Sequence, residues 1–206
     1  MYARSMSGRE DWTRIENTIP FVRHSMHPVI SEIKGNLGLC MLLDQHDRRF
    51  VVISGWETEQ AMHASDPTIA PLRAEAAEML GGRPDVTEWE VAALMRTGEL
   101  QPGNWISVAH LTADHGSVDR VVDAFRAAVL PAVTGLRAFR GALLLVNRAE
   151  GRVANAVLFD RYTAMHDAHR KGAPIHDLSA AGLPMDAARV TNYELEIADM
   201  RLPDSI

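Results

Sequence analysis

Histidines are the residues of this chain whose type and spacing most directly suggest chemistry. The tripeptide Ala-Met-His occurs twice, ending at His63 and at His166, and His110 lies in an apolar stretch. A neutral imidazole accepts a proton from a phenol near pH 7, so these three residues are the candidate catalytic bases. The alternative is that each lies on the surface of a helix or strand beside a core residue.

Two histidine pairs have the spacing of metal ligands on a helix. His24 with His27, and His166 with His169, are three residues apart, which places both imidazoles on one face. Neither pair has a third ligand at fixed spacing, and Cys40 is the only cysteine. The sequence also lacks dinucleotide-binding, phosphate-loop and zinc-protease motifs. We therefore expect no metal and no cofactor.

Aromatic and isolated polar residues within the apolar segments are candidates to line a cavity. Ligand cavities are mostly apolar with a few placed polar groups, whereas the same aromatic side chains also fill cores. Both interpretations stay open from sequence. The candidates are His24, Trp56, Trp89, Phe125, Asn155, Phe159 and Tyr193.

The elements that must position these side chains are encoded twice. Residues 2–65 align with residues 105–168 at a constant offset of 103 without a gap, with nine identities. A period this long indicates two whole small domains rather than a solenoid. We predict one repeat at 1–97 and a second at 104–201, joined by a linker rich in turn formers.

Each copy predicts the element order β-α-β-β-α-β. Apolar runs separated by short turns predict hairpins, and the last strand of each copy alternates apolar and polar residues. Thr13 and Glu16 have capping-box spacing before the first helix, which Pro20 and Pro28 should strain or kink. In the second copy, Ser117 is the predicted N-cap of the corresponding helix.

This order predicts an α+β fold of two ferredoxin-like repeats. One sheet face of each repeat would be apolar and uncovered, and soluble monomers rarely leave so large a patch exposed. The two copies should therefore close into an intramolecular dimeric α/β barrel, an internal pseudo-dimer that leaves room for a further homodimer.

Composition restricts the partners. The 206 residues carry a net charge of −6 with a pI near 5.8 and no basic cluster, so we expect no nucleic acid. No apolar run reaches the length of a membrane helix and the N-terminus lacks a signal-like stretch, so we expect no membrane and a cytoplasmic location.

Residues 38–65 resemble a known family. A glycine-led apolar strand ending at Asp44 is followed by a turn, a strand, and the segment Trp-Glu-Thr-Glu-Gln-Ala-Met-His-Ala-Ser at 56–65. This pattern, repeated more loosely at 141–168, is similar to the antibiotic biosynthesis monooxygenase-like group of the dimeric α/β barrel superfamily. The resemblance covers nearly the whole chain, once per copy.

The resemblance implies a cofactor-independent monooxygenase acting on an aromatic or phenolic small molecule. The alternative is a non-catalytic small-molecule-binding or assembly module on the same barrel. Heme binding or degradation is a minor alternative, because the positions that carry a second Trp and a heme-ligating His in the heme-degrading members hold Ser65 and Glu75, and Ala168 takes the Trp position in the second copy.

Overall fold

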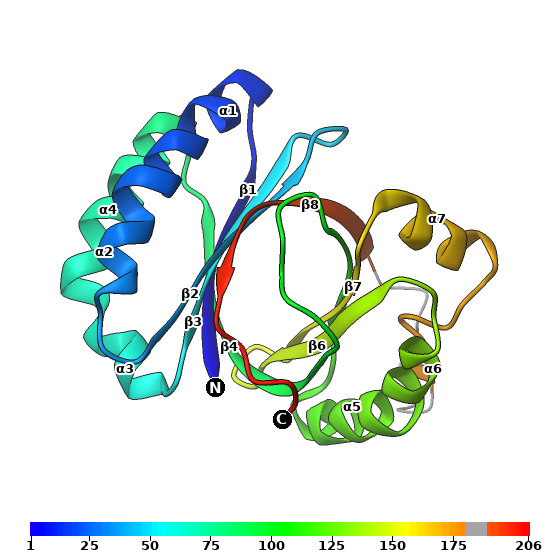
Figure 1. Ribbon diagram of the computed structural model, residues 1–206. Coiled ribbons are helices and arrows are strands. Elements are labelled where there is room, and N and C mark those ends of the chain that lie inside the picture. Colours follow the sequence, from blue (N-terminus) through cyan, green and yellow to red (C-terminus); the bar gives the residue numbers. More distant parts are fainter. Residues whose placement is uncertain (180–188) are drawn as a thin grey trace. The chain divides into compact units, whose positions relative to one another are not determined.

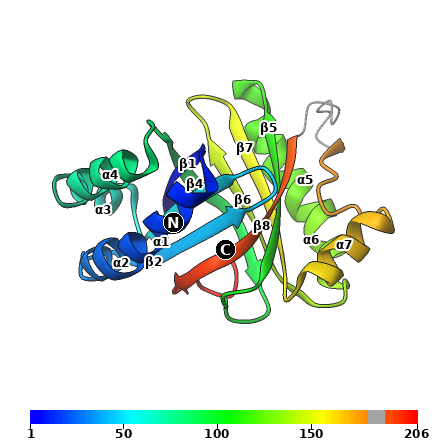
Figure 2. The same ribbon diagram turned by 90° about the horizontal axis from the view of Figure 1, so that it is seen from above.

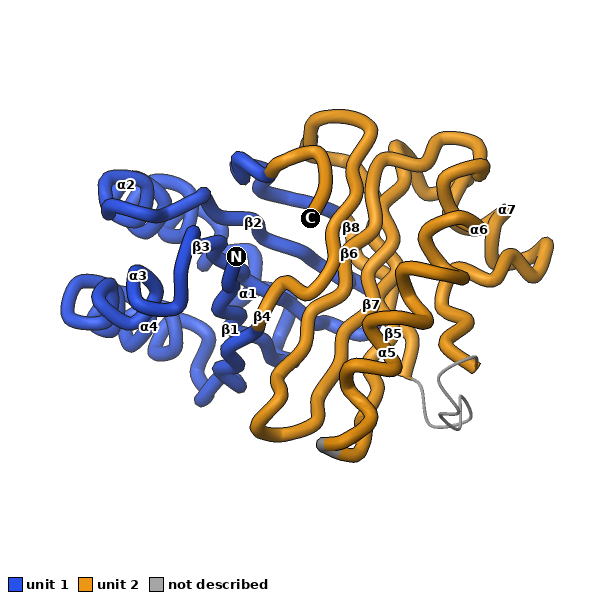
Figure 3. The backbone as a smooth tube through the Cα atoms, turned by 90° about the horizontal axis from the view of Figure 1, so that it is seen from below, with its two compact units in different colours: residues 1–89, 195–202 blue, residues 90–194, 203–206 orange. Residues whose placement is uncertain are grey.

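The computed structural model describes two compact units within the chain (Figure 3). Each unit is built from two stretches of sequence. The described residues are 1–179 and 189–206; unit 1 comprises 1–89 and 195–202, and unit 2 comprises 90–194 and 203–206. The predicted repeat boundaries stay a prediction, since these units group residues by contact and not by repeat.

Unit 1 packs its helices on one face of strands β1, β2 and β3 (Figure 1). Its elements, including the long strand β4 that continues into unit 2, are β1 (Tyr2–Arg9), α1 (Trp12–Phe21), η1 (Val22–Met26), α2 (His27–Ser31), β2 (Asn36–Asp44), β3 (Arg49–Trp56), α3 (Glu59–Ala64), α4 (Asp66–Leu80) and β4 (Asp85–Arg96).

Unit 2 repeats the arrangement, with α5, α6 and α7 along one face of β5, β6 and β7 (Figure 2). Its elements, including the strand β8 that continues into unit 1, are β5 (Trp105–Thr112), η2 (His115–Ser117), α5 (Val118–Ala124), η3 (Phe125–Val129), α6 (Leu130–Thr134), β6 (Phe139–Asn147), β7 (Arg152–Phe159), α7 (Tyr162–Arg170) and β8 (Arg189–Met200).

The strands pair in the order β1-β3-β2-β8-β5-β7-β6-β4, and this order closes into a barrel. The pairs β1–β3 and β2–β3 in unit 1, and β4–β6, β5–β7, β5–β8 and β6–β7 in unit 2, are antiparallel. The predicted α+β fold of two ferredoxin-like repeats forming a dimeric α/β barrel is confirmed. A closed sheet leaves no long free edge, which removes the risk of pairing with another chain.

Each unit has its own core between its helices and its sheet. In unit 1 Trp56 and Met62 are fully buried, and in unit 2 Phe125 and Phe159 are. Side chains alternate between the two faces of a strand, so every second residue of β3 and β7 faces the helices. Burying rings and thioethers of this size stabilises each unit by about 1.5 to 3 kcal/mol per side chain.

The first long helix of each repeat continues through its prolines instead of stopping. A π-helical turn interrupts it at Val22–Met26 and at the equivalent Phe125–Val129, shortly before Pro28 and Pro131. Proline lacks the N–H that would bond one turn back, and a widened turn accommodates its ring. Pro20 lies inside α1. The expected strain at Pro28 thus takes the form of a π turn.

The predicted cap of the first helix is wrong by two residues. Asp11 is the N-cap, because its carboxylate accepts a hydrogen bond of 2.9 Å from the backbone N–H of Thr13. The carboxylate of Asp11 meets the free amides of the first turn and the positive end of the helix dipole. In residues 1–179 and 189–206, no helix combines the length and apolar character needed to cross a membrane.

Candidate functional site

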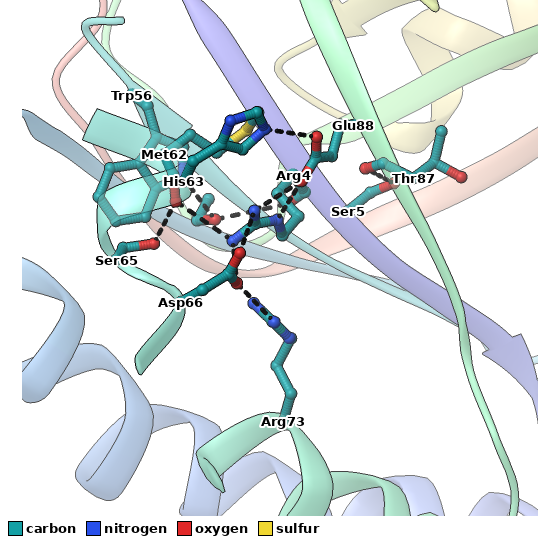
Figure 4. A network of polar contacts seen from close by, with 11 residues as sticks. Arg4, Ser5, Trp56, Met62, His63, Ser65, Asp66, Arg73, Thr87 and Glu88 are labelled. Carbon is teal, nitrogen blue, oxygen red and sulfur yellow. Dashed lines mark hydrogen bonds and ion pairs between the residues drawn. The ribbon is translucent and has the colours of Figure 1, made fainter. Parts of the chain in front are cut away.

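A network of charged side chains lies between the sheet and helices of unit 1 (Figure 4). Arg4, only 5% exposed, donates two hydrogen bonds of 2.9 and 3.1 Å to Asp66 and two of 2.6 and 3.1 Å to one oxygen of Glu88. His63 Nε2 lies 2.9 Å from the second oxygen of Glu88, and Arg73 donates a bond of 2.8 Å to Asp66. The buried guanidinium is therefore shared by two carboxylates.

The network holds both carboxyl groups in their charged form. Burial acts to raise the pKa of Asp66, but hydrogen bonds and charge from Arg73 and Arg4 outweigh it and the pKa lies below its usual value. Glu88 behaves alike: burial opposes the shift, and Arg4 and His63 lower its pKa. Because both folded pKa values are depressed, the network contributes stability above the unfolded pKa values near 4.

Acid should weaken unit 1 through these groups. We expect the free energy of unfolding to fall as the pH drops from about 5 to 3, and Glu88→Gln to remove roughly 0.5 to 1 kcal/mol of that dependence, a modest figure because both carboxylates are about 40% exposed. Urea denaturation at each pH measures it. The exposed Glu16→Gln is the control, and equal slopes in the two variants would contradict the assignment.

The space beside this network is nearly filled. A cavity of about 20 Å³ remains among Arg4, Met26, Leu39, Ile69 and Arg73. This volume suits a single water molecule. This space beside the network is therefore too small for an organic substrate.

The same place in unit 2 holds a neutral polar cluster. Ser107 on β5 is fully buried, and its Oγ lies 2.9 Å from Nε2 of His169 and 2.9 Å from Nε2 of His176. Asn155 on β7, also fully buried, donates a hydrogen bond of 3.3 Å to the backbone carbonyl of Ile175. Two imidazoles thus meet at one serine hydroxyl.

Two polar atoms of this cluster have no hydrogen-bond partner among the described residues. They are Nδ1 of His176 and Oδ1 of Asn155. A buried polar atom without a partner costs about 1 to 3 kcal/mol, so such atoms are normally satisfied by water or by a ligand. The cluster therefore contains two buried polar atoms that no described residue satisfies.

Burial keeps both imidazoles neutral. It lowers the pKa of His176 to about 3, with nearby His169 acting in the same direction. It also lowers the pKa of His169, assisted by His166 and opposed by Asn192. A perturbed pair of titratable groups on a buried serine is a typical sign of a functional site.

The charged network and the neutral cluster occupy equivalent positions of the two repeats. At the offset of 103, Arg4 corresponds to Ser107 and Asp66 to His169. The cation of unit 1, which fills its site with ion pairs, is replaced in unit 2 by a small hydroxyl. The two copies have therefore diverged at the same point of the fold.

The candidate bases lie in three different settings. His63 joins the charged network and is 51% exposed. The exposed His166 stacks on Tyr162 with ring centroids 5.7 Å apart. His110 is half-buried. It lies on one face of β5, and Ala109 and Ser107 lie on the other.

The candidate cavity residues are mostly core. Trp56, Phe125 and Phe159 are fully buried in the two hydrophobic clusters. Trp56 Nε1 donates a bond of 3.0 Å to Ser54, and Trp89 Nε1 donates one of 2.9 Å to Ser5.

Of the remaining candidates, Asn155 alone joins the neutral cluster. Tyr193 is buried on β8 opposite Ile106, and His24 is exposed on η1. Ser65 and Glu75 stand at the two positions that were compared with heme-degrading proteins. Ser65 is buried and its hydroxyl donates a 2.6 Å hydrogen bond to the carbonyl of Met62, and Glu75 is exposed.

The sequence alone did not identify Ser107 or His176 as site residues. It indicated His169 only as one half of a possible metal-binding pair with His166. Ser107 sits inside an apolar strand, and its signal was that the gapless alignment places it opposite a charged Arg4. His176 lies in an irregular segment after α7, and the residue pattern of such a segment does not predict where a side chain points. The described part of the chain contains no group of three or more potential metal ligands.

Comparison with known proteins gives the family. No family model matches the chain. The uncharacterized protein Rv2557 of Mycobacterium tuberculosis is 32% identical over 209 aligned positions, covering 100% of this chain and 92% of that protein. Identity at this level over almost the full length of both proteins shows common descent.

Solved structures agree with the fold. A proposed monooxygenase from Lactobacillus acidophilus superposes with a TM-score of 0.73 at 11% identity over 100% of this chain and 97% of the other. An anthrone oxidase-like protein gives 0.69 at 11% over 98% and 94%. A Listeria monocytogenes ferredoxin-fold protein related to antibiotic biosynthesis monooxygenases gives 0.53 at 10% over 96% and 95%. The chain therefore belongs to the family of the mycobacterial protein Rv2557 and has the two-copy ferredoxin-like barrel fold of the antibiotic biosynthesis monooxygenase-like group.

Proposed function

We propose that this protein is a cofactor-independent monooxygenase for a phenolic or enolisable aromatic substrate, and that its reaction centre is the neutral cluster of unit 2. The observation that carries the proposal is that Nδ1 of His176 and Oδ1 of Asn155 are both buried and without a hydrogen-bond partner among the described residues. An acidic O–H or C–H of an aromatic substrate is the donor that such acceptors lack. The fold shared with an anthrone oxidase-like protein supports this substrate class.

His176 can transfer a proton although it cannot retain one. With a pKa near 3 it does not become an imidazolium at neutral pH. It can instead accept the substrate proton at Nδ1 while its Nε2 proton passes to Ser107 and the hydroxyl proton passes to His169, over two contacts of 2.9 Å. His169 is only half-buried and releases the proton to solvent.

The remaining chemistry belongs to the substrate and to oxygen. Loss of the proton leaves a carbanion, which is the reductant for O₂. For an anthrone, the methylene carbon is oxidised to a carbonyl, one oxygen atom of O₂ enters the product, and the other leaves as water. The amide of Asn155 is held by its hydrogen bond of 3.3 Å to the carbonyl of Ile175, so its free Oδ1 is preorganised to accept a hydrogen bond from a substrate hydroxyl and orient the ring.

Oxygen uptake tests this function. Wild-type protein is incubated with a panel of anthrones and hydroquinones in buffer containing a metal chelator, and O₂ consumption is followed with an electrode. We expect enzyme-dependent uptake with at least one anthrone, one O₂ per product, and one ¹⁸O atom in the product when ¹⁸O₂ is supplied.

Absence of uptake across the panel would refute the proposal. If the same aromatics quenched tryptophan fluorescence without being oxidised, the result would favour the alternative, a non-catalytic small-molecule-binding module. A shift of the Soret band on titration with heme would instead favour the heme alternative.

A further inference from the structure

A second feature of unit 2 is a groove between the end of α6 and helix α7, separate from the neutral cluster. Its volume is about 270 Å³, near the lower end of small-molecule sites. The lining residues come from the turn after α6 and from both ends of α7, and they are Leu136, Arg137, Arg161, Thr163, Ala164, Asp167, Ala168 and Lys171.

Cations dominate this lining. Arg137 and Lys171 form no ion pair with any residue that the structure describes, whereas Arg161 is bound to Asp160 at 2.9 Å. Asp167, which is the acidic residue of the groove, is paired with Arg170 at 3.2 Å. A chain with a net charge of −6 thus gathers three cations around one concave surface.

The equivalent place in unit 1 lacks this character. At the offset of 103, Arg137 corresponds to Lys34, Arg161 to Thr58 and Lys171 to Thr68. Two of the three cations are therefore specific to unit 2. Unit 1 serves as an internal reference that has the fold without the charge.

Backbone strain accompanies the groove. Ala138 has a φ of 64°, in the left-handed region that L residues rarely adopt. Its counterpart Gly35 also has a positive φ, and a Cβ added there would lie 2.8 Å from Cβ of Ala61 in α3. A real Cβ at position 138 prevents Ala164, the counterpart of Ala61, from approaching so closely. Unit 2 therefore carries a strained alanine at the turn position where unit 1 has a glycine.

We propose that this groove binds the phosphate group of a small organic phosphate. Arginine presents paired donors that match phosphate oxygens, and lysine adds a compact charge. The hydroxyl of Thr163 is a further donor in the lining. The groove is larger than a bare tetrahedral anion, so an ester with an organic part fills it better than free phosphate does.

Binding of inorganic phosphate, phenyl phosphate and glycerol phosphate to the full-length protein tests the site, with calorimetry or ³¹P NMR as the readout. We expect the esters to bind more tightly than inorganic phosphate, and affinity to fall with added salt. Arg137→Gln and Lys171→Gln should each weaken binding about tenfold, since a charge-assisted hydrogen bond is lost. Lys34→Gln in unit 1 is the matched control and should change it less than about twofold.

Ala138→Gly provides an independent variant that keeps every charge. It should raise the melting temperature, because glycine relieves the strained φ, and weaken phosphate binding, because α7 can then approach the turn. Equal losses in Lys34→Gln and Arg137→Gln would show general charge screening and overturn the proposal. So would the absence of binding in the wild type. A preference for inorganic phosphate over both esters would overturn the assignment to an organic ligand.

Discussion

His176→Asn is expected to lower kcat for the oxygenation by about 10²- to 10⁴-fold, the range typical of losing a positioned acid–base group. Asparagine retains a polar atom near Ser107 Oγ. Unlike imidazole, it cannot accept a proton on one atom while it releases a proton from a second atom. Asparagine is smaller than histidine and also polar, so we expect the fold to be kept although His176 is only 8% exposed, and far- and near-UV circular dichroism should match the wild type. Initial rates of oxygen uptake measure the effect.

The exposed His46→Asn serves as the control for this variant and should retain wild-type activity. Ser107→Ala should slow the reaction strongly as well, because it interrupts the path between the two imidazoles. In the wild type, kcat should hold at pH 6.5 and fall only at lower pH, since the pKa of His169 is lowered and this residue must be neutral to receive the proton. Loss of activity in His63→Asn with full activity in His176→Asn would place the reaction in unit 1 instead.

Gly38→Ala is expected to destabilise unit 1 by about 3 to 5 kcal/mol, as the sum of backbone strain and overpacking. Gly38 has a φ of 118°, which disfavours any side chain, and an added Cβ would lie 2.1 Å from the backbone oxygen of Asp199 on β8. That oxygen cannot move without breaking the strand. The glycine also follows the register shift where β2 pairs with β3. Urea denaturation and thermal melting measure the loss.

Gly116→Ala is the matched control, because nothing lies within 4 Å of its added Cβ and its φ is not in the left-handed region. Its unfolding free energy should stay within about 0.5 kcal/mol of the wild type. A Gly38→Ala protein as stable as this control would mean that β8 does not lie against β2 as described.

Several features of the fold followed from sequence because their causes are local. The offset of 103 between repeats, the hairpins and the alternating last strands depend on hydrophobic periodicity and turn residues. The resemblance of residues 56–65 to a barrel family identified the topology. Asp11 replaced Thr13 as the cap because a two-residue difference in where the helix begins is not encoded by spacing alone.

The proposed reaction centre, in contrast, depends on contacts between residues far apart in the chain. Ser107 lies 62 residues from His169 and 69 from His176, and the three meet only when α7 and the segment after it pack on β5. The alignment alone made His63 and His166 equal candidates for the catalytic base, because an alignment compares positions in the sequence and not the surroundings of a side chain. What separated the two copies was the charge of the buried groups: Arg4 and its carboxylates fill unit 1 with ion pairs, although Nη1 of Arg73 is left without a partner, whereas unit 2 keeps neutral imidazoles with unpartnered Nδ1 of His176 and Oδ1 of Asn155. Sequence determined that one unit is present twice; tertiary packing decided which of the two retained a proton acceptor, because the charge state of a side chain is set by its neighbours and its access to water.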